Sequence, residues 1–106
     1  MNQGMKSPAE CTSIEEVRAA IDAIDHEVVT ALGLRARYVK AITRFKKTKE
    51  DVHAPSRQAA VISQRRAWAE EEGLDPEVVE RIYRTLIDHF VTEELKELRL
   101  VESDHA

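Results

Sequence analysis

The chain has few of the residues that interrupt helices or build strands. Its 106 residues include only three glycines and three prolines, and aromatic residues make up 5% of them. Glycine and proline are the residues that helices tolerate least, and β-branched runs are also few, so the composition predicts an all-α fold. The length suits a single domain, but charged residues make up 34% of it. One chain alone would therefore have a thin core, and an oligomer is expected.

The chain also lacks the signatures of several functional classes. Lysine and arginine are spread along a chain of net charge −4, which disfavours nucleic-acid binding. No apolar run approaches the roughly 20 residues of a membrane span. Residues 1–10 contain no apolar signal core, so we expect a cytoplasmic protein that binds no membrane. The single cysteine, Cys11, cannot form an internal disulfide and is interpreted as a bystander.

Motifs for metal, phosphate and nucleophile chemistry are missing as well. There is no Cys/His cluster with metal-ligand spacing, no glycine-rich phosphate loop and no evident Ser/His/Asp set. The histidines are scattered, and His89, beside Phe90, is interpreted as a structural side chain. No residue pattern in the chain thus points to a metal site, a phosphate-binding loop or a catalytic nucleophile.

The chain does contain one long amphipathic segment, from about Thr12 to Lys47, with Thr12 and Ser13 as candidate N-caps. Apolar residues recur in it at steps of three or four, apart from one gap, and form an apolar seam: Ile14, Val17, Ile21, Ile24, Val28, Leu32, Val39 and Ile42. Gly33 should cost about 1 kcal/mol relative to alanine, but the pattern resumes in phase after it, which predicts one uninterrupted helix. A helix of roughly 35 residues spans about 50 Å, whereas a compact chain of this length has a radius of gyration of about 13 Å. The helix should therefore extend beyond its own domain, and its seam needs a partner.

Basic residues lie on or beside this seam. Arg35 occupies the gap in the pattern, Lys46 continues the same face, and Arg18 lies beside it. Arg35 and Lys46 would be close to three turns and about 16 Å apart, so their side chains could hold a small dianion between them. Arg18 lies about 25 Å from Arg35 along the helix, so it would reach the same ligand only from an antiparallel partner helix. With Arg57 at the start of the next helix, the set suits a compact substrate with two carboxylates. Each cation could instead be a solvated surface residue or form an intrahelical ion pair, such as Arg18 with Asp22.

Two further helices are predicted after a connecting loop at residues 47–54. Pro55 can occupy the first turn of a second helix, which runs from about Ser56 to Glu72 and stops at Gly73. Its inward-facing residues are expected to be Val61, Ile62, Ala67 and Trp68.

A third helix begins at a strong start signal, Asp75-Pro76-Glu77, which combines an N-cap, a proline at the first position and an acid in the first turn. It is expected to run to about Val101, with Glu94 at the edge of its apolar face. That face consists of Val79, Ile82, Tyr83, Leu86, Phe90, Leu95 and Leu98. The chain thus divides into a flexible arm (residues 1–11), a single helical domain (residues 12–101) and a frayed tail (residues 102–106).

Three short motifs together resemble a known family. They are R-x-x-I-D-x-I-D from Arg18, L-x-x-R ending at Arg35 with a downstream F-K at Lys46, and A-P-x-R ending at Arg57. The chain resembles the all-helical chorismate mutases from about Cys11 to Arg99. It is most similar to the subgroup of isochorismate-pyruvate lyases that form salicylate.

The resemblance implies an intertwined homodimer of three-helix chains with two equivalent active sites, which act without a cofactor on chorismate or isochorismate. By this resemblance Arg18 would reach into the partner's site, and Arg35 and Arg57 would bind substrate carboxylates. Lys46 would hydrogen-bond the ether oxygen and a carboxylate. Glu94 occupies the position at which many members place a glutamine that donates to the ether oxygen.

The chain departs from the family pattern at two positions. The typical mutase has a carboxylate three residues before the Arg57 position, where it accepts from the ring hydroxyl of the substrate, but here the residue is Ala54. Because chorismate and isochorismate carry that hydroxyl at different ring positions, Ala54 favours isochorismate. An ionised Glu94 cannot donate a hydrogen bond, so it would have to be protonated to replace the glutamine. Otherwise it would pair with Lys46 and spoil the site.

The leading hypothesis is an isochorismate pyruvate-lyase that forms salicylate and pyruvate, with weak chorismate mutase activity in the same pocket. Lys46 would be the main electrostatic catalyst, helped by a protonated Glu94, and residues 47–53 could act as a lid. A dedicated chorismate mutase that forms prephenate is the alternative. An inactive helical dimerisation module is a second alternative, motivated by Glu94.

Overall fold

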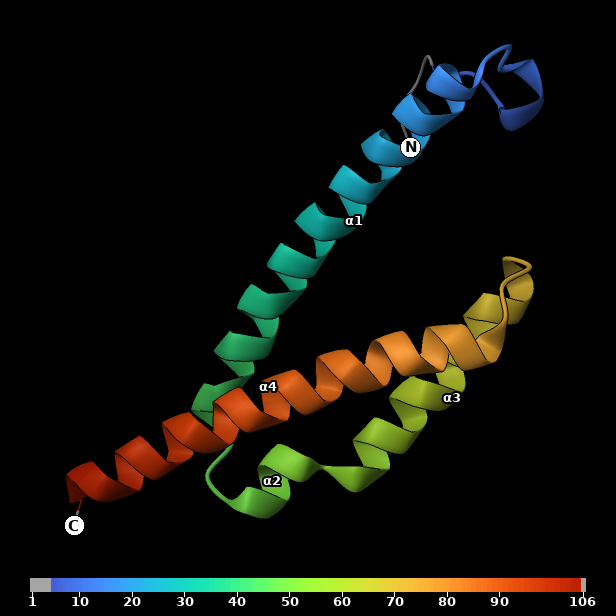
Figure 1. The fold of residues 1–106 in the computed structure, drawn as a ribbon. Coiled ribbons are helices and arrows are strands. Elements are labelled where there is room, and N and C mark those ends of the chain that lie inside the picture. The colour runs from blue at the N-terminus through green and yellow to red at the C-terminus, as the bar shows by residue number, and fades with distance from the viewer. Residues whose placement is uncertain (1–4, 106) are drawn as a thin grey trace. The chain divides into compact units, whose positions relative to one another are not determined.

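The computed structural model describes residues 5–105, and side chains as far as Arg99. Residues 1–4 of the predicted arm and Ala106 of the predicted tail lie outside it. The described residues form helices and no strand, which confirms the all-α prediction (Figure 1). They divide into two compact units, one ending at Tyr38 and the other beginning at Val39.

The first unit is dominated by α1, Ile14–Ile42, which runs through Gly33 without interruption as predicted. Its start follows from local chemistry, because the Ser13 side chain accepts a hydrogen bond from the amide of Glu16 at 3.2 Å. A short 3-10 turn, η1 (Pro8–Glu10), precedes it, and Lys6 forms a 3.0 Å ion pair with Glu16.

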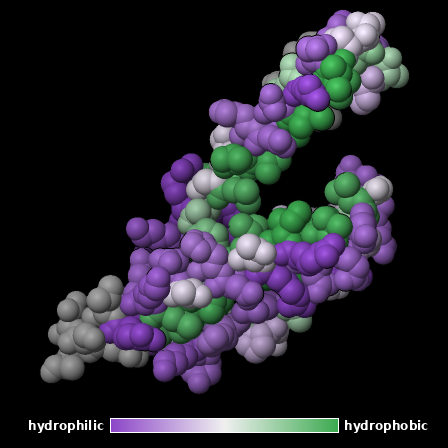
Figure 2. All heavy atoms as spheres, viewed as in Figure 1, coloured by the Kyte–Doolittle hydropathy of each residue, from purple (hydrophilic) through white to green (hydrophobic). Residues whose placement is uncertain are grey.

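No side chain of α1 is buried in this chain. The seam residues Ile14, Val17, Ile21, Ile24 and Val28 are each between 40% and 57% exposed. Figure 2 shows hydrophobic side chains at the surface along this helix. That this seam needs a partner stays a prediction.

The predicted helix from Thr12 to Lys47 is wrong at its C-terminal end. The α-helix stops at Ile42 and tightens into a 3-10 turn, η2 (Thr43–Phe45), after which Lys46 is extended. Lys46 therefore does not continue the face of α1, and the predicted spacing of three helical turns from Arg35 does not exist.

The predicted loop at residues 47–54 is also partly wrong, because it contains a short helix, α2 (Lys49–His53). A capping box starts this helix: the Thr48 side chain accepts from the Asp51 amide, and the Asp51 side chain accepts from the Thr48 amide. Val52, at 3% exposure, anchors α2.

The two remaining helices are α3, Pro55–Glu71, and α4, Pro76–His105, which begin as predicted. The Asp75 side chain accepts from the Glu77 amide at 2.9 Å, and Gly73 adopts φ 73° in the connecting turn. α4 packs against both α3 and α2. It extends to His105, beyond the predicted end at Val101.

The core of the second unit is thin, as the composition predicts. Among the described residues the buried apolar side chains are Val52, Val61, Ile62 and Ala69. The prediction that Ala67 and Trp68 face inward is wrong: Ala67 is exposed and Trp68 is 45% exposed. The buried face of α3 continues at Ala69 instead, and the Arg65 guanidinium lies 4.7 Å from the centre of the Trp68 ring.

None of the helices in the described part of the chain is both long enough and apolar enough to cross a membrane. The cytoplasmic location stays a prediction.

Candidate active site

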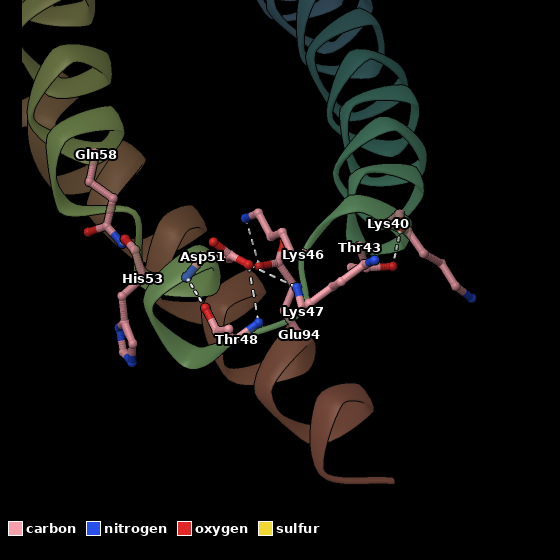
Figure 3. A network of polar contacts seen from close by, with 9 residues as sticks. All are labelled: Lys40, Thr43, Lys46, Lys47, Thr48, Asp51, His53, Gln58 and Glu94. Atoms are coloured by element: carbon pink, nitrogen blue, oxygen red, sulfur yellow. Dashed lines mark hydrogen bonds and ion pairs between the residues drawn. The ribbon is translucent and has the colours of Figure 1, made fainter. Parts of the chain in front are cut away.

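The structure brings together the two residues predicted to be catalytic, Lys46 and Glu94 (Figure 3). The Lys46 ammonium donates to Oε2 of Glu94 at 3.0 Å, across 48 positions of sequence. The side chains are 20% and 6% exposed, respectively. Glu94 is the buried charged residue among those the structure describes. The pair therefore holds two charges in partly dehydrated surroundings.

Such a pair is not a strong source of stability, because dehydration of both charges offsets much of their attraction. Removing one partner would leave the other charge buried and uncompensated, which is costly. A new anion could instead compete with Glu94 for the ammonium. The geometry thus places an ammonium donor in direct contact with a carboxylate in mostly enclosed surroundings.

The backbone on both sides of Lys46 is fixed by hydrogen bonds. The amide of Lys46 donates to the carbonyl of Thr43 at 3.2 Å, within η2. Oδ2 of Asp51 accepts from the amides of Lys47 and Thr48, at 3.0 and 3.2 Å (Figure 3). Sequence reasoning missed Thr48 and Asp51, although the spacing T-x-x-D is close to a capping box.

These hydrogen bonds also act on the Asp51 carboxyl. The amides of Lys47 and Thr48 lower the pKa of Asp51 below its usual value, and the nearby charge of Lys46 adds to the effect. The physical cause is that both the donated hydrogen bonds and the positive charge favour the ionised carboxylate.

Arg57 is the third residue of α3, as predicted, and is exposed. Ala54 is the N-cap of α3 and joins α2 to α3. It has left-handed backbone angles of φ 37° and ψ 60°. Gln58 donates to the carbonyl of His53 across this junction. Ala54 therefore stands at a backbone position that glycine, asparagine or aspartate would occupy with less strain.

Arg18 and Arg35 both lie on α1, where Arg18 is exposed and Arg35 is half-buried. At 1.5 Å per residue they are about 25 Å apart along the helix, so one small ligand cannot touch both in one chain. They belong to the first unit, whereas Lys46, Arg57 and Glu94 belong to the second. That the three arginines share a pocket with Lys46 stays a prediction.

The structure has two hollows beside these helices, one in each unit. One of about 250 Å³ lies beside α2 and α4 and is lined by Lys49, His53, Leu95, Leu98 and Arg99. A larger one of about 470 Å³ lies between the N-terminal segment and α1, and no predicted site residue lines it. The larger hollow is therefore not where the predicted chemistry gathers. Among the described side chains, no group of His, Cys, Asp or Glu could hold a metal ion.

Comparisons with known proteins agree on one family. Residues 17–95 match the family described as chorismate mutase type II. The chain is also 45% identical, over 92 residues, to a protein of Pseudomonas aeruginosa named isochorismate pyruvate lyase. That alignment covers 87% of this chain and 91% of the relative. The helical chain with its Lys46–Glu94 pair therefore belongs to the chorismate mutase type II family.

Proposed function

We propose that this protein is an isochorismate pyruvate-lyase, which converts isochorismate to salicylate and pyruvate, with weak chorismate mutase activity in the same site. The observation that carries the proposal is the 45% identity to the lyase from Pseudomonas aeruginosa, which extends over nearly the whole of both chains. The residues expected to act, Arg18, Arg35, Lys46, Arg57 and Glu94, all lie within the aligned family region at residues 17–95.

The reaction breaks the ether bond between the ring and the enolpyruvyl group through a cyclic transition state, in which negative charge develops on the ether oxygen. A protein can accelerate this step by holding the two carboxylates in the compact conformer and by aiming fixed donors at that oxygen. Lys46 is the main donor in this proposal, because its ammonium lies in a mostly enclosed position. The arginines hold the carboxylates.

Glu94 is the second donor in this proposal, in its protonated form. Without substrate it accepts from Lys46 at 3.0 Å. Glu94 donates to the ether oxygen in this proposal only when the substrate takes over the ammonium of Lys46 and the carboxyl group carries a proton.

The backbone at Ala54 supports isochorismate as the preferred substrate. A left-handed conformation costs a residue with a Cβ about 1–2 kcal/mol, and aspartate tolerates it better than alanine does. Alanine at φ 37° is therefore not the residue that local backbone preference would select. Its presence removes the carboxylate that would accept from the ring hydroxyl of chorismate.

We also propose that the active protein is a homodimer. The seam residues of α1 from Ile14 to Val28 are at least 40% exposed in this chain, which leaves a long apolar face for a second copy. The separation of Arg18 from Arg35 adds a functional reason, because Arg18 would reach a substrate held by Arg35 only from the partner chain.

The catalytic role is tested by Lys46→Ala, with Lys96→Ala as a matched control. Lys96, on α4, also pairs with a glutamate, but its side chain is 64% exposed. Removing the Lys46 donor should lower kcat/KM for isochorismate by about 100-fold or more, as expected for a donor at a developing oxyanion. Lys96→Ala should change it by less than about twofold, because exposed ion pairs contribute little.

Two outcomes would contradict the proposal. If Lys46→Ala keeps its helical circular dichroism and also its activity, Lys46 is not the donor. If the wild-type protein converts neither isochorismate nor chorismate, the chain is an inactive dimerisation module.

A further inference from the structure

We propose that Asp51 is a positioning residue. It holds Lys46 in place for catalysis by accepting hydrogen bonds from the backbone amides of Lys47 and Thr48, the two residues that follow Lys46. The inference rests on the proposed function only in the role given to Lys46. Asp51 itself touches no substrate in this account.

The geometry joins Asp51 to the chain at Lys46 directly. Lys46 stands in an extended conformation between η2 and α2, where its own amide donates to the Thr43 carbonyl at 3.2 Å at the end of η2. One carboxylate oxygen of Asp51 binds both following amides, those of Lys47 at 3.0 Å and Thr48 at 3.2 Å. Thr48 returns the interaction, because its hydroxyl accepts from the Asp51 amide at 3.1 Å. A single side chain thus closes the turn that carries Lys46.

The other end of this arrangement is fixed to the helix that carries Glu94. Val52, next to Asp51, is 3% exposed, and α2 packs against α4. Asp51 therefore connects the backbone at Lys46 to the same element that presents its partner Glu94. A lysine side chain has several rotatable bonds, so its ammonium can be well positioned only when its backbone is held in place.

Charge offers a different account of Asp51, which the test must separate from positioning. The charge of Lys46 lies close enough to contribute to the lowered pKa of the Asp51 carboxyl group, after the hydrogen bonds from the Lys47 and Thr48 amides. If the charge of Asp51 were its role, replacing it by the neutral side chain of the same shape, asparagine, would lower activity as much as removing the side chain. If positioning is its role, asparagine should serve, because its amide oxygen can accept the same two hydrogen bonds.

The experiment compares Asp51→Ala and Asp51→Asn with the wild-type protein. Asp51→Ala should lower kcat for isochorismate by about tenfold, since small misplacements of a catalytic group are costly. The change in KM should be smaller, because the donor matters most where charge develops in the transition state. Asp51→Asn should recover most of kcat. Amide hydrogen exchange at Lys47 and Thr48 should become faster in Asp51→Ala than in Asp51→Asn.

Asp75→Ala is the matched control, because Asp75 also caps a helix through its carboxylate, at 2.9 Å from the Glu77 amide, but outside the proposed site. It should lower thermal stability and leave kcat unchanged. An unchanged kcat in Asp51→Ala, or an equal loss in Asp51→Asn and Asp51→Ala, would overturn the proposal. If the wild-type protein acts on neither substrate, the proposed function fails by itself. The exchange rates then decide alone: faster exchange at the two amides supports the hold on the Lys46 backbone, and unchanged exchange rejects it.

Discussion

Glu94 combines three properties that determine its chemistry in this site. It is acidic, it is 7% exposed, and it accepts a hydrogen bond from a lysine at 3.0 Å. Buried carboxylates need such partners, because an isolated buried charge is unfavourable. The same position in a donor role needs a proton, so the chemistry of the site depends on the protonation of this one side chain.

The first prediction follows from that dependence. Glu94→Gln carries a permanent donor, so its kcat/KM for isochorismate should be at least that of the wild-type protein, whereas Glu94→Ala, which has no donor, should lose about 100-fold. Steady-state kinetics measure both. Glu93→Gln, which alters an exposed pair with Lys96, is the control. Equal values in Glu94→Gln and Glu94→Ala would reject the role of Glu94.

The second prediction concerns Ala54. Ala54→Asp restores a carboxylate at the start of α3 and should shift the ratio of kcat/KM towards chorismate by about tenfold, the value of one modest hydrogen bond to a charged group. Aspartate also tolerates the left-handed backbone, so the fold should not suffer. Ala54→Gly, which relieves the backbone without adding an acceptor, should stabilise the protein and leave the ratio unchanged. Equal ratios in Ala54→Asp and the wild-type protein would contradict this reading of specificity.

Among the elements, the starts of the three long helices could be predicted, whereas the short helix α2 and the ends of α1 and α4 could not. α1 and α4 begin at Ser13 and Asp75, where capping side chains and acids adjoin the first turn, so the signal is local. The end of α1 has no glycine or proline between Ile42 and Lys46 to mark it. Beyond that end Lys46 contacts Glu94, which lies 48 positions away and which no local pattern contains.

The faces of helices were predicted less well than their limits. α3 has a weakly segregated sequence, so its periodicity does not decide between Trp68 and Ala69 as the buried residue. The stacking of Arg65 on the Trp68 ring, and on Tyr83 of α4 at 5.4 Å, keeps the large aromatic at the surface. Such a contact between two helices cannot be read from either helix alone.

The third prediction concerns the ion pairs that connect α3 with the start of α4. Arg66 contacts Glu77 at 2.8 Å and Glu80 at 2.7 Å, and Arg84 contacts Glu80 at 2.7 Å. The hydrogen bond from Arg84, and then that from Arg66, lower the pKa of Glu80 below 4.5. A lowered pKa in the folded state means that the stabilisation is complete above about pH 4.5 and is lost as pH falls through the folded-state value.

Glu80→Gln should therefore be less stable than the wild-type protein at pH 7, and the difference should shrink at about pH 3. Thermal unfolding followed by circular dichroism at the two pH values measures it. An equal difference in thermal stability at both pH values would show that the charge of Glu80 does not contribute to the stability of the fold. Glu70→Gln, on the exposed surface of α3, should change neither value.

For the whole molecule, the sequence predicted the family and the absence of strands, because helical periodicity and several short motifs extend over most of the chain. It could also predict that one chain would have a thin core, since a third of its residues are charged. In the proposed homodimer, the assembly of the arginines with Lys46 depends on how two copies combine, and a single chain does not contain that information. The place of the arginines in the site therefore stays a prediction, whereas the structure describes the Lys46–Glu94 pair.

The fourth prediction is the dimer itself. Sedimentation equilibrium at micromolar concentration should give twice the mass of the 12.1 kDa chain. Replacing Ile21 and Val28 of the seam by aspartate should give monomers, because two charges would be buried in the interface. An Arg18→Ala protein mixed with an Arg35→Ala protein should regain activity. Each dimer that combines one chain of each kind contains one site with both arginines intact. A monomeric wild-type protein, or no recovery on mixing dimers that exchange subunits, would contradict the shared site.

The most direct test of the account is the ratio of kcat/KM for isochorismate to that for chorismate, measured side by side with the wild-type protein and identification of the products. The account predicts a higher value for isochorismate, with salicylate and pyruvate formed in equal amounts, and slow formation of prephenate from chorismate. A higher value for chorismate would contradict it, and would identify the protein as a chorismate mutase instead.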